Sequence, residues 1–384
     1  MAEPTGKVQF HHQQLSSLIS HFLVFGLGLV IGTSFHFSIS GSLISSSNFE
    51  LMRQYWPVTP PQPAPVVVGM REFRSSKSVG QEMMMSSSEG PHPPGDQLVH
   101  RMRGLPAVKG IIRGKVAFMF LTRGDLPLRP FWERFFNGNE GLYSIYVHSD
   151  PSFNATFPLN SVFHGRTIPS KVVEWGQPSM IEAERRLLSN ALLDVSNQRF
   201  LLLSESCIPV FNFTTVYTYL MGSAHIFVES YDLPGRLGRN RYRSKMQPTI
   251  IETQWRKGSQ WFEMDRRTAT VVVEDRKYFP LFQKYCRPNC ISDEHYLATM
   301  MSIEFGERNS NRTLTWTDWS KHGPHPTGFE SEDVTVELLE RIRDGSMCEY
   351  NGERSRICYL FARKFMGSAL NRLLEIASQI MFIH

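Results

Sequence analysis

Asp293, Glu294 and His295 are three consecutive residues whose side chains can all take part in proton transfer. The apolar run that begins at Tyr296 predicts a helix, so the triplet is expected at the start of that helix. A helix dipole stabilises a carboxylate in the first turn, and a carboxylate beside a second acid and a histidine can act as a general base. The triplet could therefore be a catalytic site, a simple helix cap or part of a metal site.

The cysteines of the chain, five in number, all lie in its C-terminal two thirds, as they would in a protein of an oxidising compartment. Cys348 with Cys358 would close a short loop and is the preferred disulfide, followed by Cys286 with Cys290. A zinc site built from Cys286, Cys290 and His295 is the alternative. We disfavour it because the sequence offers no evident fourth ligand at a usual spacing.

Length and composition are those of a globular protein, with 384 residues of which 41% are hydrophobic and 20% are charged. The net charge is +5, but the basic residues are scattered apart from a stretch at 236–245. This distribution favours a local anionic ligand and argues against nucleic acid as a partner.

An apolar segment near the amino end predicts a membrane anchor. It contains the run Phe22–Gly32, and roughly 20 residues at 1.5 Å each can span a bilayer. A cleaved signal peptide is the alternative, but the Ser-rich sequence that follows offers only a weak cleavage site. We expect a cytoplasmic tail (1–20), a single-pass transmembrane signal anchor (21–44), a disordered stem (45–113) and a catalytic domain on the non-cytoplasmic side (114–384).

The expected stem is rich in proline and serine and has no sustained periodicity of helix or strand. Three N-glycosylation sequons follow it, at Asn154, Asn212 and Asn311. They support the placement of the catalytic domain on the lumenal side.

Short apolar runs alternate with helical patterns after residue 114, which is typical of an α/β sheet with helices on both faces. The clearest helical pattern covers 179–195. Strands are expected at 116–121, 143–148, 200–203, 225–228 and 270–273. Ligands collect at the carboxyl ends of such strands, where the sequence places polar residues of the segments 148–150, 204–206 and 229–232.

Transfer of a sugar from a nucleotide donor needs a base for the acceptor hydroxyl and positive charge on the departing diphosphate. A metal held by an Asp-x-Asp motif is the usual source of that charge in this type of fold, and the sequence contains no such motif. The segment Glu263-Met-Asp265 is the one most similar to an Asp-x-Asp motif. It follows two aromatic residues and precedes two arginines, so we interpret it as structural.

Six spaced segments resemble the core-2/I-branching β-1,6-N-acetylglucosaminyltransferases, and most closely their plant relatives of the brittle-culm type. The resemblance covers about residues 114 to 366, and the segments are Ile145–Asp150, Leu202–Pro209, Trp255–Phe262, Asp293–His295, Thr317–Ser320 and Cys358–Phe365. It implies a GT-A-like (Rossmann-type) fold, a UDP-sugar donor, inversion at the anomeric carbon and no metal cofactor. It also implies a type II protein of the Golgi membrane that moves N-acetylglucosamine or a related sugar.

The resemblance assigns the catalytic base to Glu294, with Asp293 and His295 in supporting positions. It places the donor diphosphate on Lys364 and on a second cation, for which Arg354, Arg356 and Arg363 are the candidates. Asp150 matches the residue that contacts the uridine or its ribose. The candidates for acceptor contacts are Trp319, Glu229, Asp232, Arg239 and Arg241.

The expected partners are therefore a UDP-sugar, a glycan or glycoprotein acceptor and a membrane. A non-enzymatic alternative is a Golgi-resident glycan-binding or scaffold protein with a degenerate site, which the ambiguous second cation leaves open. A metal-dependent hydrolase that uses His295 is disfavoured, because no paired histidine spacing supports it. Plant relatives are linked to cell-wall traits, and glycoprotein or arabinogalactan glycans are plausible acceptors by resemblance alone.

Overall fold

The computed structural model describes residues 114–287, 290–321 and 323–380. The expected tail, membrane anchor and stem lie outside these residues. Within the described part of the chain, no helix is both long enough and apolar enough to cross a membrane.

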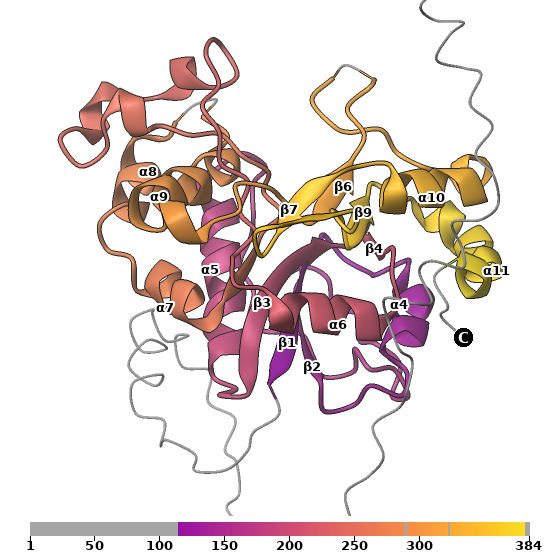
Figure 1. The fold of residues 1–384 in the computed structure, drawn as a ribbon. Helices are drawn as coiled ribbons and strands as arrows, with labels where there is room; N and C mark the ends of the chain where they lie inside the picture. The colour runs from indigo at the N-terminus through magenta and orange to yellow at the C-terminus, as the bar shows by residue number, and fades with distance from the viewer. Residues whose placement is uncertain (1–113, 288–289, 322, 381–384) are drawn as a thin grey trace, which may run out of the picture. The chain divides into compact units, whose positions relative to one another are not determined.

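The strands of the structure fall into one larger sheet, one small sheet and one hairpin (Figure 1). In chain order they are β1 (Lys115–Leu121), β2 (Tyr143–His148), β3 (Asn197–Ser204), β4 (Ile208–Pro209), β5 (Glu263–Asp265), β6 (Thr315–Thr317), β7 (Cys348–Tyr350), β8 (Glu353–Ser355) and β9 (Phe361–Arg363).

The α-helices surround these strands. In chain order they are α4 (Arg129–Phe136), α5 (Pro178–Leu192), α6 (Phe213–Gly222), α7 (Arg266–Glu274), α8 (Phe279–Tyr285), α9 (Tyr296–Glu304), α10 (Val336–Asp344) and α11 (Leu370–Ile380).

The larger sheet has the strand order β2-β1-β3-β5. β1 pairs in parallel with both β2 and β3, whereas β5 runs antiparallel to β3. β1 is buried at all five of its interior positions, as expected for the centre of a parallel sheet that is covered on both faces. The carboxyl ends of β1, β2 and β3 therefore lie at one edge of the sheet.

The two faces of the sheet carry separate hydrophobic cores. Phe118 and Phe120 of β1 point into one core, and Ala117 and Met119 point into the other, because successive side chains of a strand alternate. Figure 1 shows α4 and α6 on the first face and α5 and α7 on the second. Helices on both faces confirm the predicted α/β architecture.

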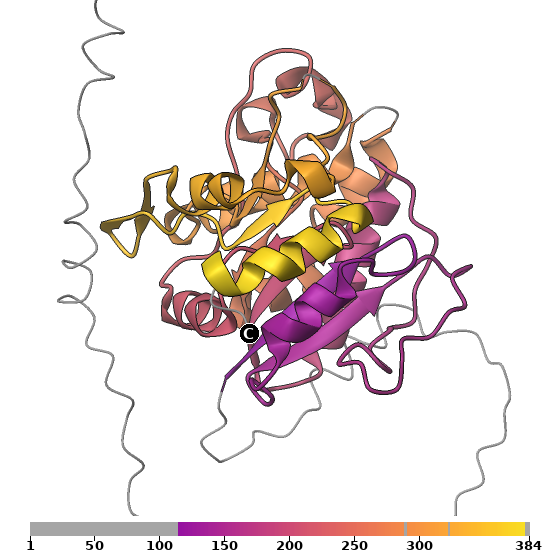
Figure 2. The same cartoon turned by 90° about the vertical axis from the view of Figure 1, so that its right-hand side faces the viewer.

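The C-terminal part of the chain returns to the first core. β9 lies between β4 and β6 in the small sheet, and this pairing brings the end of the chain back to the end of β3. α11 then packs beside α4, where the Arg134 guanidinium donates to the carbonyl of Leu374 at 3.0 Å (Figure 2). β7 and β8 form an antiparallel hairpin, and a disulfide joins Cys348 of this hairpin to Cys358.

Two of the five expected strands are wrong. The run 270–273 lies inside α7, because Asp265 caps the helix by accepting from the Thr268 amide and the buried residues recur at helical spacing. The β-branched valines of this run had suggested a strand. The run 225–228 is not a strand of the sheet either, although Ile226 and Phe227 each form a single β-bridge.

Candidate active site

The edge formed by the carboxyl ends of β1, β2 and β3 carries the polar residues that the sequence placed there. Asp150 follows β2 and Ser206 follows β3, as expected, and Arg123 follows β1 at a position that was not expected. The amide of Phe365 donates to the carbonyl of Ser206 at 2.9 Å, so the neighbouring Lys364 also lies at this edge. Segments that are far apart in the sequence thus meet where an α/β sheet binds ligands.

Glu294 occupies a short 3-10 helix, Ser292–Glu294, which precedes α9 as a separate turn. The expected triplet is therefore next to the helix but not in its first α-helical turn. The cause is Ile291, whose φ of 52° bends the chain before the turn begins. The Glu294 carbonyl accepts from the Gly258 amide at 2.8 Å, which fixes the turn against a second segment.

The carboxylate of Glu294 is held asymmetrically. Its Oε2 accepts from Arg241 Nη1 at 2.7 Å and from Lys257 Nζ at 2.6 Å, and its side chain is 24% exposed. Its Oε1 accepts no hydrogen bond from the described residues. One oxygen is thus fixed by two cations while the other remains available to a ligand.

Gly258 allows the segment that carries Lys257 to pack closely against the backbone of Glu229. A Cβ on Gly258 would collide with the Glu229 carbonyl oxygen, so only glycine allows this approach. Lys257 and Tyr231 also exchange two backbone hydrogen bonds of 2.9 Å each. These contacts place Lys257 where its ammonium group meets Glu294.

Asp293 belongs to a buried group of acids behind Glu294. Burial, together with the charge of Glu294, raises the pKa of Asp293 to about 7. Glu184 of α5 accepts from Gln260 Nε2 at 3.0 Å, and burial together with Asp293 raises the pKa of Glu184 well above its usual range. Both carboxyl groups thus tend to keep a proton, because two buried like charges are costly.

Replacing Asp293 with asparagine is expected to raise the free energy of unfolding by an amount that grows with pH. In the folded wild type the carboxyl keeps its proton up to about pH 7, whereas in the unfolded chain it loses the proton above its ordinary pKa of 3.8. The wild type therefore loses stability as the pH rises through this window, and asparagine has no proton to lose. Urea unfolding of both proteins across the window measures the difference, and a difference that does not change with pH would contradict the assignment.

His295 is a structural residue in this geometry. Its ring stacks on Trp255 at a centroid distance of 4.6 Å, and its Nδ1 lies 2.7 Å from the Arg256 carbonyl. Burial, together with the nearby charges of Lys257 and Arg241, lowers the pKa of His295 to about 3. Cys286 is joined to Cys290 by a disulfide, as the second of the two expected pairings predicted, so both sulfur atoms are engaged with each other.

A cluster of positive charge lies at the sheet edge beside Lys364. Burial lowers the pKa of His325, and the nearby cations Lys364, Arg123 and Arg363 lower it further. Arg363 is partly buried with its guanidinium carbon 4.2 Å from the ring centroid of Trp261, and its buried Nε has no hydrogen-bond partner among the described residues. Positive groups gathered in this way favour an anionic ligand.

The cation cluster and the Glu294 turn are connected through Trp175 and Gly176. The ring of Trp175 lies 5.7 Å from that of His325. The next residue, Gly176, accepts from the Ser292 amide at 3.1 Å. Its φ is +71°, and a Cβ there would lie 2.8 Å from the Ile291 side chain, so glycine is required for this contact. The two charged regions are therefore linked through this short loop.

The acceptor candidates separate into two groups. Arg241 contacts Glu294 directly, and the charges of Glu294 and Lys257 both act on Glu229, whose pKa is raised mainly by burial. Asp232 and Arg239 instead form an exposed ion pair with each other. Trp319 is 51% exposed in the loop after β6.

The remaining donor candidates lie at the surface. Asp150 accepts from the amide and the hydroxyl of Ser152, at 2.9 and 2.6 Å, and these hydrogen bonds lower its pKa. Arg354 and Arg356 are exposed on and after β8, whereas Arg363 lies with Lys364 around His325. The structure therefore favours Arg363 over the other two as the neighbour of Lys364.

The sequons occupy different settings. Asn154 and Asn311 are exposed, and Asn212 caps α6 by accepting from the Thr215 amide at 2.9 Å.

Sequence reasoning missed several residues of the site, namely Lys257, Arg123, Glu184 and Trp175. Lys257 stands inside one of the six family-like segments, which was a signal that it could have a role. Arg123 follows the first strand directly, a position where ligand contacts are common. Glu184 carried no signal, because a glutamate in an amphipathic helix is normally exposed.

With this geometry established, comparison with known proteins identifies the class. Residues 116–343 match the model of the Core-2/I-Branching enzyme family, which covers more than half of the chain. The chain therefore belongs to the Core-2/I-Branching enzyme family of glycosyltransferases, and the resemblance stated above is confirmed. Among its relatives is the protein described as Glycosyltransferase BC10 from Oryza sativa subsp. japonica, which is 37% identical over 309 residues. That match covers 68% of this chain and 76% of the rice protein.

Proposed function

We propose that the protein is an inverting, metal-independent glycosyltransferase that moves N-acetylglucosamine or a related sugar from a UDP-sugar to a glycan acceptor. The observation that carries the proposal is the Glu294 carboxylate, whose Oε2 is fixed by Arg241 and Lys257 while Oε1 has no partner among the described residues. A carboxylate fixed in this way is oriented for use as a general base.

The reaction is a single displacement at the anomeric carbon of the donor sugar. Glu294 Oε1 takes the proton of the acceptor hydroxyl as the hydroxyl oxygen forms the new glycosidic bond. The bond between the anomeric carbon and the diphosphate oxygen breaks at the opposite side, and the electron pair leaves with UDP. The protonated Glu294 then returns its proton to solvent.

The departing UDP carries negative charge, which needs stabilisation in the transition state. Lys364, Arg363 and Arg123 are positioned around His325 to provide it. Fixed cations can neutralise a diphosphate as a divalent metal does. Asp150 at the end of β2 is the proposed contact for the uridine or its ribose.

The acceptor is proposed to lie between Glu294 and the loop after β6. Glu229 and Arg241 are close enough to Glu294 to bind hydroxyls next to the one that reacts. The exposed indole of Trp319 would offer a flat apolar face to a sugar ring.

A lumenal location in the Golgi, with a type II membrane anchor at 21–44, is part of the proposal. The two disulfides support an oxidising compartment. The exposed sequons at Asn154 and Asn311 are compatible with it, and glycosylation of these residues is proposed with it.

A transfer assay with a panel of UDP-sugars in EDTA tests the proposal, with UDP-N-acetylglucosamine as the first donor. We expect transfer that chelator does not abolish. Loss of all transfer in EDTA, with recovery on addition of Mn²⁺ or Mg²⁺, would contradict the metal-independent mechanism. UDP binding without transfer to any acceptor would instead favour the glycan-binding alternative with a degenerate site.

A further inference from the structure

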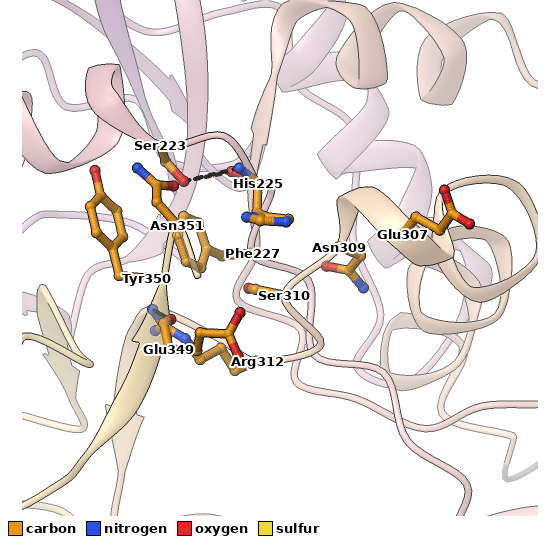
Figure 3. A pocket seen from close by; sticks show the side chains of 10 residues that line it. All are labelled: Ser223, His225, Phe227, Glu307, Asn309, Ser310, Arg312, Glu349, Tyr350 and Asn351. Atoms are coloured by element: carbon orange, nitrogen blue, oxygen red, sulfur yellow. Dashed lines mark hydrogen bonds between the residues drawn. The ribbon is translucent and has the colours of Figure 1, made fainter. Parts of the chain in front are cut away.

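A polar pocket of about 310 Å³ lies between the β7–β8 hairpin and the segment 307–312 (Figure 3). His225 and Phe227 form its inner wall, Tyr350 and Asn351 contribute from the hairpin, and Glu307 lies at the opposite side. None of these residues belongs to the site around Glu294.

The walls of the pocket are fixed by contacts within the protein. Arg312 donates to the Cys358 carbonyl and to the Tyr219 hydroxyl, at 2.6 Å each, and its guanidinium carbon lies 4.7 Å from the ring centroid of Phe227. The Asn351 side chain donates to the Gly222 carbonyl and accepts from the Ala224 amide, at 2.9 Å each. The walls of the pocket at Arg312 and Asn351 are thus fixed before a ligand binds, while the side chains of Glu307 and Glu349 are exposed.

Three ionisable side chains that line the pocket are not used by these contacts. The ring of His225 and the carboxylates of Glu307 and Glu349 form no hydrogen bond with the described residues. The described residues also provide no group of three or more such side chains that could hold a metal. Carboxylates and an imidazole in a fixed polar cavity can bind the hydroxyl groups of a sugar.

A single segment, 225–231, connects this pocket with the Glu294 site. Ile226 and Val228 pack into one hydrophobic core of the protein, whereas Phe227, which is also only 1% exposed, packs into the other. The segment forms β-bridges at Phe227 and at Tyr231, as an extended chain does. Side chains of an extended chain alternate between two sides, so residues 225, 227, 229 and 231 share the other side.

Residues 225 and 227 of this row face the pocket, and residues 229 and 231 lie near Glu294. His225 and Phe227 line the pocket. Burial, together with the charges of Glu229 and Glu294, raises the pKa of Tyr231 to about 12. The inner members of the row, Phe227 and Glu229, are two residues of extended chain apart, roughly 7 Å, and the outer members, His225 and Tyr231, are six residues apart, roughly 20 Å.

Tyr359 forms a second link between the two places. Burial raises the pKa of Tyr359, Glu229 raises it further and Arg312 lowers it. The charges of Glu229 and Arg312 therefore both act on the Tyr359 hydroxyl. Glu229 lies beside the proposed position of the reacting hydroxyl, and Arg312 lines the pocket.

We infer that the pocket of Figure 3 is a distal subsite for the acceptor glycan, which binds a sugar unit remote from the hydroxyl that reacts at Glu294. The inference rests on the proposed transferase function and adds that the acceptor is an oligosaccharide or a longer chain. The separation along 225–231 exceeds the length of one sugar ring, so the acceptor must extend over several units to fill both places.

Acceptor length provides the test. Transfer is measured with galacto-oligosaccharides and chito-oligosaccharides, from the monosaccharide to the hexasaccharide, and kcat/KM is expected to rise with length and then reach a plateau. Glu349→Gln and His225→Ala are each expected to lower the ratio of kcat/KM between the long and the short acceptor by about tenfold, the effect of one hydrogen bond to a charged group. Glu353→Gln is the matched control, because Glu353 is exposed on the same hairpin outside the pocket, and it should keep the wild-type ratio.

If a variant lost the same factor in kcat/KM for short and long acceptors, the defect would be structural and the inference would be overturned. A wild-type kcat/KM that does not rise with acceptor length would also overturn it. Binding of the same oligosaccharides, measured by saturation-transfer NMR on the Glu294→Gln protein, separates this inference from the proposed function. Absence of transfer to every acceptor would refute the transferase, while oligosaccharide binding that Glu349→Gln removes would still support the pocket. Binding of a lysine-rich peptide in place of any oligosaccharide would overturn the pocket as a glycan subsite.

Discussion

Replacing Glu294 with glutamine is expected to lower kcat for sugar transfer by about 10³-fold, because a positioned general base contributes between about 10² and 10⁴ to the rate. Glutamine keeps the shape of the side chain but cannot take the proton of the acceptor hydroxyl. Its side chain also loses the charge that pairs with Arg241 and Lys257. Steady-state kinetics with a UDP-sugar and a glycan acceptor provide the measurement.

Two controls make this result specific to the base. Affinity for UDP, measured by calorimetry, should stay near the wild-type value, because the cation cluster lies on other segments. Glu375→Gln is the matched variant, since Glu375 is also paired with an arginine, at 2.9 Å, but lies on α11. A Glu294→Gln enzyme that retains nearly normal turnover would refute the assignment.

Replacing Lys364 with alanine is expected to weaken UDP binding by about 10-fold to 100-fold. An ammonium group that binds a phosphate forms a charge-assisted hydrogen bond, worth roughly 1.5–3 kcal/mol. Lys364 lies beside Arg363 and Arg123 around His325, so the loss leaves part of the positive charge in place. The expected effect is therefore large but incomplete.

Calorimetry with UDP and with uridine distinguishes a phosphate contact from a general defect. The Lys364→Ala protein should bind uridine, which has no phosphate, as the wild type does. Lys284→Ala serves as the matched control, because this lysine is exposed on α8. An equal loss of affinity for UDP and for uridine would show that Lys364 supports the fold rather than the diphosphate.

The central part of the fold was predictable from the sequence because its elements have strong local patterns. The buried runs of β1, β2 and β3 are short, apolar and bounded by turn residues, and α5 has a clear apolar face. Glu263-Met-Asp265 was also interpreted correctly as structural. Glu263 pairs with Arg199 in the core at 2.6 Å, and Asp265 caps α7.

α7 and β5 were not predictable, because the local sequence of each either favours two structures or shows no pattern. The valines of 270–273 favour a strand by propensity, but the cap at Asp265 and the tertiary packing of α7 favour a helix. The antiparallel β5 has only three residues and no visible pattern of its own. Its place in the sheet is decided by pairing with β3.

Residues of the candidate site could be proposed from the sequence only where a family-like segment marked them, as at Glu294 and Lys364. The ion pair of Lys257 with Glu294 joins residues that are 37 positions apart, and sequence spacing gives no information about such contacts. The same holds for Arg123, which approaches Lys364 only because β9 returns to the end of β3. The group of Glu184, Gln260 and Asp293 likewise exists only in the folded chain.

The most direct test of the central claim, a single displacement with Glu294 as its only base, is the anomeric configuration of the first product. The new glycosidic bond does not mutarotate, so proton NMR of the product, with an α-linked UDP-sugar as donor, reports this configuration directly. We predict a β-linked product. An α-linked product would show retention of configuration and would contradict the mechanism.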